Sequence, residues 1–213
     1  VKRADHGFRQ LSREERRSAY HTRRLRPGTG RYHWVDTLYG LSEVAVYAAV
    51  VEQIDTHGGS VDYGQLFSDI RDCADLSHQD GSILDDVLSD LTRYVERDPE
   101  LGVLLHKLRS AGKRLFLLTN SGPEYTEAMM SYLLGGALEE YPNWRNYFDF
   151  AVTAAKKPSF FTGKARFVDA KTSAPTTEPE RGQLYLGGNI ADLERALGYS
   201  GDEVLYVGDH IYG

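Results

Sequence analysis

The first half of the chain repeats its apolar positions with the period of an α-helix. We expect helices over residues 43–54, 63–77 and 82–95, with Ser42 as the N-cap of the first. Cys73 lies on the apolar stripe of the second helix, so we expect it to be a buried small hydrophobic residue. Residues 32–39 are aromatic and β-branched, which favours an extended segment before the first helix. The pattern predicts a helical module near residues 40–96.

From residue 98 the pattern changes to helices that alternate with short apolar runs. We expect a helix between the N-cap Asp98 and the C-terminal signal Gly112, and further helices over 123–134 and 190–197. We expect strands over 114–118, 148–152 and 203–207, and a polar loop over 174–181. This rhythm is typical of a parallel α/β sheet. The predicted fold class is α/β, with a Rossmann-like parallel core over residues 98–213 and an N-terminal segment and helical module over residues 1–97.

Composition excludes several classes of protein. The chain has 213 residues, of which 41% are hydrophobic, and a single cysteine, so neither a disordered chain nor a disulfide framework fits. No apolar run approaches the roughly 18 residues of a membrane span, and the N-terminus does not resemble a signal peptide. We therefore expect a soluble, cytoplasmic protein. Because the chain starts at Val1 and stops directly after an apolar run, we also expect a piece of a longer protein.

Charge is distributed unevenly along the chain. The formal net charge is −6, yet residues 1–31 contain ten Lys or Arg residues and only three acidic ones. Such a basic arm could bind nucleic acid, but no aromatic stacking platform accompanies it. A solvated surface segment is the preferred interpretation, and a nucleic-acid partner is the least favoured hypothesis.

Polar side chains follow each of the three predicted strands. Thr119 and Asn120 follow the first, Lys157 the second and Asp209 the third. Ligands of open parallel sheets bind beyond the carboxyl ends of the strands, so we expect these groups to converge. A hydroxyl and an amide at a helix N-terminus can hold phosphoryl oxygens, a lysine stabilises developing negative charge, and a carboxylate suits Mg²⁺. The pattern predicts magnesium-dependent phosphoryl transfer.

Three segments resemble motifs of the haloacid-dehalogenase phosphatase superfamily. Residues 117–121 (LLTNS) are similar to the second motif, 155–161 (AKKPSFF) to the third and 205–213 (LYVGDHIYG) to the start of the fourth. The KKPxFF run, the GDHIYG end and the helical segment 69–78 more narrowly resemble cytosolic purine 5′-nucleotidases specific for IMP and GMP. The resemblance implies hydrolysis of purine nucleoside monophosphates through an aspartyl-phosphate, and a homo-oligomer.

The resemblance also implies residue roles. Thr119 and Asn120 would bind phosphate together with Ser121, Lys157 would neutralise charge and Asp209 would bind Mg²⁺. The helical module over residues 1–97 would be the cap of such an enzyme. In it, an aromatic side chain would stack on the base and three polar ones would recognise it; these are Tyr39, Arg71, Asp75 and His78. The last three are spaced i, i+4 and i+7, which places them on one helical stripe.

The chain also departs from the family pattern. The nucleophile and the acid/base of the family belong to a D-x-D-x-[TV] motif, which occurs nowhere in the 213 residues. We therefore expect this chain alone to be inactive, and a regulatory nucleotide-binding module without catalysis is the alternative. Taken singly, Thr119 could start a turn, Lys157 could be a surface lysine and Asp209 a turn residue. Arg71 and Asp75 could form an i,i+4 ion pair on a solvated face.

Overall fold

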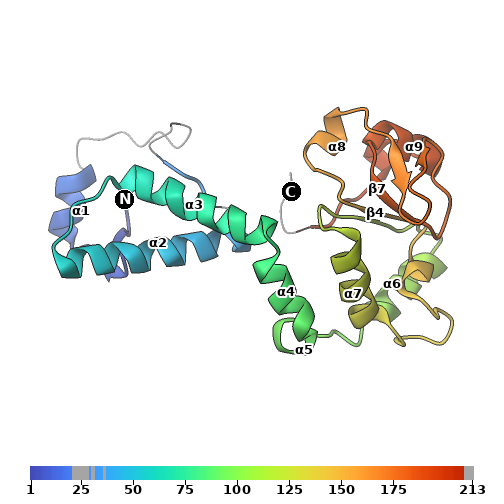
Figure 1. The fold of residues 1–213 in the computed structure, drawn as a ribbon, viewed down its shortest axis with the longest axis horizontal. Helices are drawn as coiled ribbons and strands as arrows, with labels where there is room; N and C mark the ends of the chain where they lie inside the picture. The colour runs from blue at the N-terminus through green and yellow to red at the C-terminus, as the bar shows by residue number, and fades with distance from the viewer. Residues whose placement is uncertain (21–28, 30–31, 36, 209–213) are drawn as a thin grey trace. The chain divides into compact units, whose positions relative to one another are not determined.

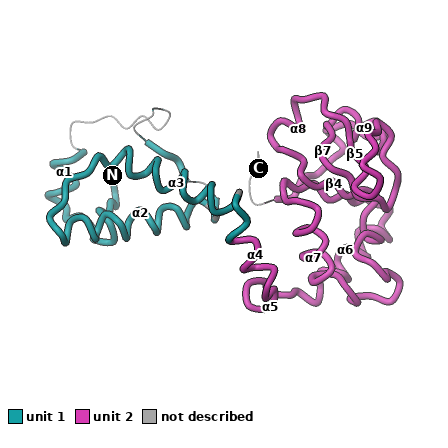
Figure 2. Tube along the Cα trace, in the orientation of Figure 1, with its two compact units in different colours: residues 1–82 teal, residues 83–213 magenta. Residues whose placement is uncertain are grey.

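The computed structural model describes residues 1–20, 29, 32–35 and 37–208, without the side chains of Tyr39 and Gln79. The chain divides into two compact units, residues 1–82 and 83–213 (Figure 2). The functional division into a cap up to residue 97 and a core from residue 98 stays a prediction. No helix in the described ranges is long and apolar enough to cross a membrane.

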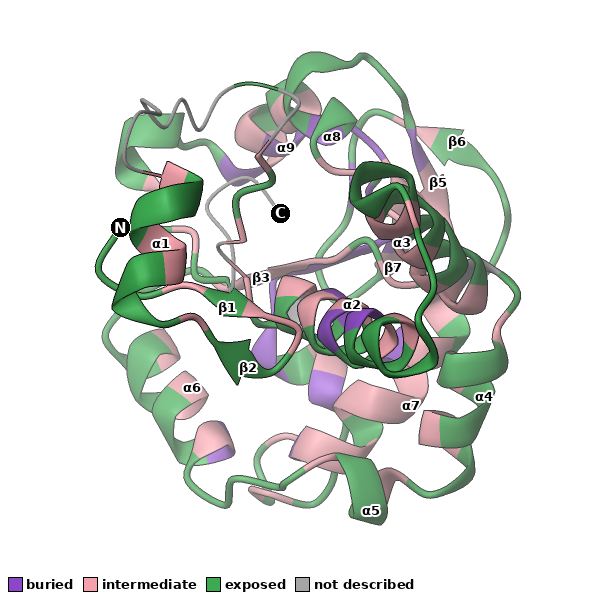
Figure 3. Cartoon of the chain, turned by 90° about the vertical axis from the view of Figure 1, so that its left-hand side faces the viewer, coloured by how far each residue is buried: buried purple, intermediate pink, exposed green. Residues whose placement is uncertain are grey.

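The first unit is a helical layer preceded by a hairpin (Figure 1). Its elements are β1 (Asp5–His6), β2 (Arg9–Gln10), α1 (Arg13–Tyr20), α2 (Leu38–His57) and α3 (Tyr63–Gln79). β1 and β2 pair antiparallel, and α2 packs against α3. The buried positions of α2, purple in Figure 3, are Glu43, Ala48 and Val51.

The start of α2 corrects two expectations. Thr37, and not Ser42, caps the helix, because its Oγ1 accepts a hydrogen bond from the backbone N–H of Gly40 at 3.0 Å. Ser42 therefore lies inside α2, and the expected extended segment already ends before Leu38. Two hydroxyl residues stand five positions apart here, and the earlier one forms the cap. At the other end, Gly58 terminates α2 in the left-handed region with φ 69°.

α3 confirms the second predicted helix and extends it to Gln79. Asp62 caps it, with Oδ1 accepting from the N–H groups of Gly64 and Gln65. The expectation for Cys73 was wrong, because this residue is exposed. The half-buried face of α3 centres between Ile70 and Ala74, and Cys73 falls at its edge.

The third predicted helix is broken in two. It forms α4 (Ser82–Ser89), which begins at the unit boundary, and α5 (Leu91–Tyr94). Asp90 separates them because its side chain accepts a hydrogen bond from the backbone N–H of Arg93 and caps a new helix. The local hydrogen bonding of an aspartate thus overrides an apolar period that continues through it.

The second unit contains a mixed five-stranded sheet with helices on both faces (Figure 1). Its strands are β3 (Phe116–Leu118), β4 (Phe150–Thr153), β5 (Phe167–Asp169), β6 (Pro175–Thr176) and β7 (Leu184–Gly187), in the spatial order β3-β4-β7-β5-β6. β3, β4 and β7 are parallel, whereas β5 runs antiparallel to β6 and β7. The α/β fold class is confirmed.

Helices and two 3₁₀ turns complete the second unit. They are α6 (Leu101–Ser110), α7 (Pro123–Leu134), η1 (Trp144–Tyr147), α8 (Ser159–Thr162), α9 (Ile190–Leu197) and η2 (Gly201–Glu203). The observed bounds of α7 and α9 coincide with those predicted. Asn189 caps α9 by accepting from the N–H of Asp192, and Gly198 ends it with φ 72°.

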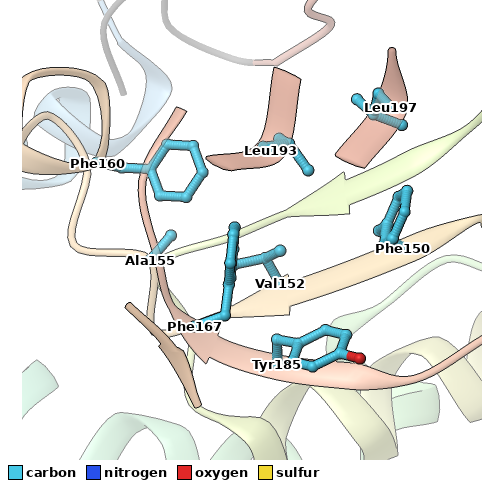
Figure 4. Packing of buried hydrophobic residues seen from close by; sticks show 8 residues of the cluster. All are labelled: Phe150, Val152, Ala155, Phe160, Phe167, Tyr185, Leu193 and Leu197. Carbon is cyan, nitrogen blue, oxygen red and sulfur yellow. The ribbon is translucent and has the colours of Figure 1, made fainter. Parts of the chain in front are cut away.

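Two apolar clusters hold the helices to the sheet. Alternation along β4 sends Phe150 and Val152 to one face and Ala151 to the other. The first cluster joins the sheet to α8 and α9 (Figure 4), and consists of Phe150, Val152, Ala155, Phe160, Phe167, Tyr185, Leu193 and Leu197. The second lies on the side of α6 and α7, and its buried members are Leu134, Trp144, Tyr147, Phe148 and Ala151. The sheet is therefore buried on both faces.

In the second unit one predicted strand is wrong, and the three observed strands β5, β6 and β7 were missed. The hairpin strands β1 and β2 of the first unit were missed as well. Residues 204–207 are extended but pair with no strand among the described residues, and Leu205 and Val207 are each 84% exposed. The strand that pairs with β4 is instead β7, at residues 184–187. The predicted loop over 174–181 contains the short strand β6, which pairs with β5.

Candidate functional site

The carboxyl ends of β3 and β4 lie side by side. The two strands are parallel with Leu118 opposite Val152. The pairing continues past both strands: the N–H of Thr119 donates to the carbonyl of Val152 at 2.9 Å, and the N–H of Ala155 donates to the carbonyl of Thr119 at 3.0 Å. A third hydrogen bond joins the two loops, from the N–H of Ala154 to the carbonyl of Ser121 at 2.8 Å. The loops after the two strands are thus held together by backbone hydrogen bonds.

Asn120 and Lys157 extend this connection through a side chain. The backbone N–H of Lys157 donates to Asn120 Oδ1 at 2.6 Å, and Asn120 Nδ2 donates to the carbonyl of Lys157 at 3.1 Å. The amide side chain therefore binds both polar groups of one peptide residue, as a neighbouring strand would. Thr119, Asn120, Ser121 and Lys157, which the sequence places in two separate motifs, come together at one edge of the sheet.

The N-terminus of α7 follows directly after Ser121. Thr119 Oγ1 accepts from the N–H of Ser121 at 3.1 Å, which shapes the turn before the helix. The N-cap is Gly122, which has no side chain to satisfy the first N–H groups, and Pro123 occupies the first helical turn. Unsatisfied N–H groups and the positive end of a helix dipole favour a bound anion. Thr119, Ser121 and the start of α7 form a surface that can receive phosphoryl oxygens.

The loop after β4 adopts a demanding backbone conformation. Ala154 and Lys156 have φ values of 44° and 59°, in the left-handed region that non-glycine residues rarely adopt. Two interactions hold the loop: Phe160 is buried in the first cluster at 1% exposure, and Ser159 Oγ donates to the carbonyl of Lys156. Strained backbone of this kind persists only where its surroundings determine it, and it concentrates at functional sites.

The side chain of Lys157 is half-buried, which differs from an ordinary surface lysine. Its Nζ donates to the hydroxyl of Tyr206 at 2.6 Å and lies 5.1 Å from the centre of that ring. Tyr206 belongs to the segment similar to the fourth motif, but sequence reasoning gave it no role. The contact links the loops of two candidate motifs through one ammonium group.

The described residues alone do not provide a metal-binding site. The predicted ligand Asp209 lies outside them. Within the described ranges, no group of three or more His, Cys, Asp or Glu side chains could hold a metal ion. These residues therefore do not form a magnesium site by themselves, and the role of Asp209 stays a prediction.

The predicted base-recognition residues all belong to the first unit. Tyr39 is in α2, and its side chain lies outside the described part. Arg71 and Asp75 are exposed positions of α3, and His78 is half-buried with Nδ1 2.8 Å from the carbonyl of Ala74. The shared stripe on one helix is therefore present, whereas the role of these residues stays a prediction.

Arg71 does not form the i,i+4 ion pair that was the alternative. In the described structure its ion pair is with Glu43 of α2, at 3.3 Å between Nε and Oε2. Sequence reasoning missed Glu43. The only signal was an acidic residue at the start of an otherwise apolar helical run, which is also what an ordinary first turn of a helix shows.

Comparison with known proteins covers the whole chain. The model of the 5′ nucleotidase family matches residues 1–213. The human 5′-nucleotidase domain-containing protein 2 is 33% identical over 181 residues, covering 82% of this chain, and the rat protein of that name has the same identity over the same length. A 5′-nucleotidase domain-containing protein of Dictyostelium discoideum is 29% identical over 221 residues and covers 97% of this chain.

The chain is short relative to these proteins. The matched regions make up 34%, 32% and 36% of the human, rat and Dictyostelium relatives, so the chain spans about a third of their length. The match nevertheless includes the loops after β3 and β4 and the helices of the first unit. On this evidence the chain belongs to the 5′ nucleotidase family.

Proposed function

We propose that the protein to which this chain belongs hydrolyses purine nucleoside 5′-monophosphates such as IMP and GMP. The observation that carries the proposal is the pair of hydrogen bonds between Asn120 and the backbone of Lys157. They bring a hydroxyl-bearing turn and a lysine to the carboxyl ends of the parallel strands β3 and β4, where α/β proteins bind ligands. Membership of the 5′ nucleotidase family supports the same class of reaction.

The residues of the second unit suit two tasks in phosphoryl transfer. Thr119 and Ser121, with the N-terminus of α7, would bind the phosphoryl oxygens. Lys157 would stabilise the negative charge that develops on the phosphoryl group as the ester bond breaks, since preorganised cations act most strongly where charge forms. Its half-buried ammonium is held by Tyr206 and so needs little reorganisation.

The proposal requires a nucleophile from outside these 213 residues. The family resemblance implies an aspartate that attacks phosphorus, releases the nucleoside and forms an aspartyl-phosphate, which water then hydrolyses. A second acidic residue would protonate the leaving oxygen. Mg²⁺ would be held through Asp209, whose carboxylate is a hard oxygen ligand suited to this ion. When bound, the ion would supply positive charge to the phosphoryl oxygens.

Substrate recognition would be the task of the first unit. Arg71, Asp75 and His78 share a face of α3 and offer donors and acceptors that suit the edge of a purine base. Tyr39 would stack on the base. We further propose a homo-oligomeric, cytoplasmic enzyme, on the resemblance alone.

The alternative function is a nucleotide-binding regulatory module without turnover. Its support is the absence of any D-x-D sequence from the 213 residues. The two functions differ in a direct way: the alternative predicts binding of IMP or GMP without release of phosphate.

Phosphate release by the full-length protein tests the proposal. With IMP or GMP and Mg²⁺ we expect turnover, its loss with EDTA and its recovery when Mg²⁺ is restored. Lys157→Ala and Asp209→Ala should lower kcat by at least about a hundredfold, the usual scale for removing one electrostatic stabiliser. Lys164→Ala, which changes an exposed lysine, is the matched control. Turnover that survives both changes would disprove the site assignment.

A further inference from the structure

Glu43 is a buried carboxylate that the proposed chemistry does not use. Its side chain is only 7% exposed and belongs to α2, which packs against α3. Burial of a carboxylate is unfavourable unless a positive charge compensates it. In the described structure that charge is the guanidinium of Arg71, whose Nε lies 3.3 Å from Oε2 of Glu43.

The ion pair is a poor source of stability. Arg71 is 45% exposed, so solvent screens the attraction, and pairs of this kind contribute little to folding. An apolar residue at position 43 would fill the same helix interface without the cost of burying charge. A buried acid that stabilises the fold so weakly is better explained by what it does to its partner.

The geometry restricts how Arg71 can present its guanidinium. This planar group carries five N–H donors in a rigid fork. Glu43 is close to Nε, while the two terminal nitrogens meet no hydrogen-bond or ion-pair partner among the described residues. An ion pair on the Nε side limits the positions of the guanidinium and leaves its terminal N–H groups to a ligand with paired acceptors. Asp75 stands one turn further on the same helix.

We propose that Glu43 is a positioning residue that orients Arg71 toward the base of the nucleotide. The inference rests on the proposed function. Glu43 itself touches no substrate; its charge limits the positions of the guanidinium before the nucleotide arrives, which reduces the ordering that binding requires. The predicted effect of removing its charge is therefore on base recognition, and not on phosphoryl transfer.

The test compares Glu43→Gln with the wild type in the full-length protein, using IMP and ribose 5-phosphate as substrates. The variant is isosteric, so packing of α2 is kept. We expect KM for IMP to rise roughly tenfold, as for one weakened charge-assisted hydrogen bond, with kcat changed by less than about twofold. Ribose 5-phosphate lacks the base, so its KM and kcat should not change. Glu52→Gln, an exposed glutamate of the same helix, is the control.

A double-mutant cycle then asks whether Glu43 acts through Arg71. Arg71→Ala should raise KM for IMP, and adding Glu43→Gln to it should have no further effect. The proposal would be overturned by an equal loss of kcat/KM with both substrates, by additive effects in the cycle, or by an unchanged KM for IMP in Glu43→Gln. If turnover is absent, calorimetry measures the Kd for IMP, and the same criteria then apply to Kd. A wild type that neither hydrolyses nor binds IMP would refute the proposed function and, with it, this inference.

Discussion

Asn120 binds the backbone of Lys157 at both its N–H and its carbonyl, at 2.6 and 3.1 Å. These two residues are far apart in sequence, and each follows a different strand. Because the amide replaces a strand neighbour, it fixes the start of the loop that carries the lysine. The position of the Lys157 ammonium thus depends on a side chain from the other loop.

Asn120→Ala should therefore lower activity more than it lowers stability. Removal of two hydrogen bonds at an exposed side chain costs about 1 kcal/mol of unfolding free energy, since water can replace them. Misplacement of the lysine should reduce kcat about a hundredfold. Phosphate release by the full-length protein and its thermal midpoint measure the two effects. Gln183→Ala, at another exposed amide of the same unit, should change neither, and an unaltered kcat in Asn120→Ala would contradict this dependence.

A second buried carboxylate, Asp149, stabilises the opposite end of β4. Its Oδ2 lies 3.1 Å from Arg109 and accepts from the backbone N–H of Leu115 at 3.0 Å, and its Oδ1 lies 3.1 Å from Nε of Arg181. Unlike Glu43, it is surrounded by donors from three segments of the chain. This is a structural network, distant from the loops that follow the strands.

Asp149→Asn should destabilise the second unit by about 2 kcal/mol, because it leaves the half-buried guanidinium of Arg109 without its counter-charge. Urea unfolding followed by the fluorescence of Trp144 reports this, since that indole is buried in the same unit. A Trp34→Phe background removes the exposed indole of the first unit. Asp86→Asn, at an exposed aspartate, should leave the midpoint unchanged. Equal midpoints for both variants would refute a structural role for the network.

Helix ends that depend on neighbouring residues could be predicted from the sequence, whereas the pairing of distant strands could not. The bounds of α9 follow from Asn189 and Gly198, which act on their own helix ends. β7 could not be found by the same means, because four residues ending at a glycine become a strand only through pairing with β4 and β5. Residues 204–207 show the reverse case: an apolar run predicts a strand, but no described strand pairs with it.

The candidate site divides in the same way. Residue types at strand ends were enough to select Thr119, Asn120 and Lys157, because parallel strands bring their carboxyl ends to one edge. The partners of these residues were not predictable. Tyr206 meets Lys157 across 49 positions of sequence, and Glu43 meets Arg71 only because α2 packs against α3. No spacing rule in one sequence reports such contacts.

Gly102 allows a close approach between α6 and the turn that follows α7. A Cβ at this position would lie 2.8 Å from Cβ of Ala137 and 3.0 Å from the hydroxyl of Tyr147. Gly102→Ala gains up to about 1 kcal/mol from the higher helix propensity of alanine. Overpacking costs about 1–3 kcal/mol, because neither Ala137 nor Tyr147 has a flexible side chain that could move away from the new methyl group. We expect net destabilisation by about 1 kcal/mol in the Trp144 assay. A stabilised Gly102→Ala would show that α6 can shift.

Glu15 and Ser12 form hydrogen bonds at the start of α1 that should make the stability of this helix depend on pH. Glu15 Oε2 accepts from the backbone N–H of Ser12 at 2.7 Å, while Ser12 Oγ accepts from the N–H of Glu15 at 3.2 Å, which is a capping box. The hydrogen bond from the Ser12 backbone, then that with its side chain and that from Arg9, lower the pKa of Glu15 from 4.5 to about 2.

A lowered carboxyl pKa stabilises the folded form above the unfolded value of 4.5, and this contribution is lost as the pH falls toward about 2. Carboxyl ¹³C shifts should therefore show Glu15 titrating near pH 2, and α1 should fray over the range between pH 4.5 and 2. Ser12→Ala removes the side-chain half of the box and should move the titration of Glu15 upward, whereas Ser18→Ala, in the same helix, should not. A Glu15 that titrates near pH 4.5 in the wild type would show that the box does not form, because a carboxylate that accepts these hydrogen bonds cannot take up a proton without losing them.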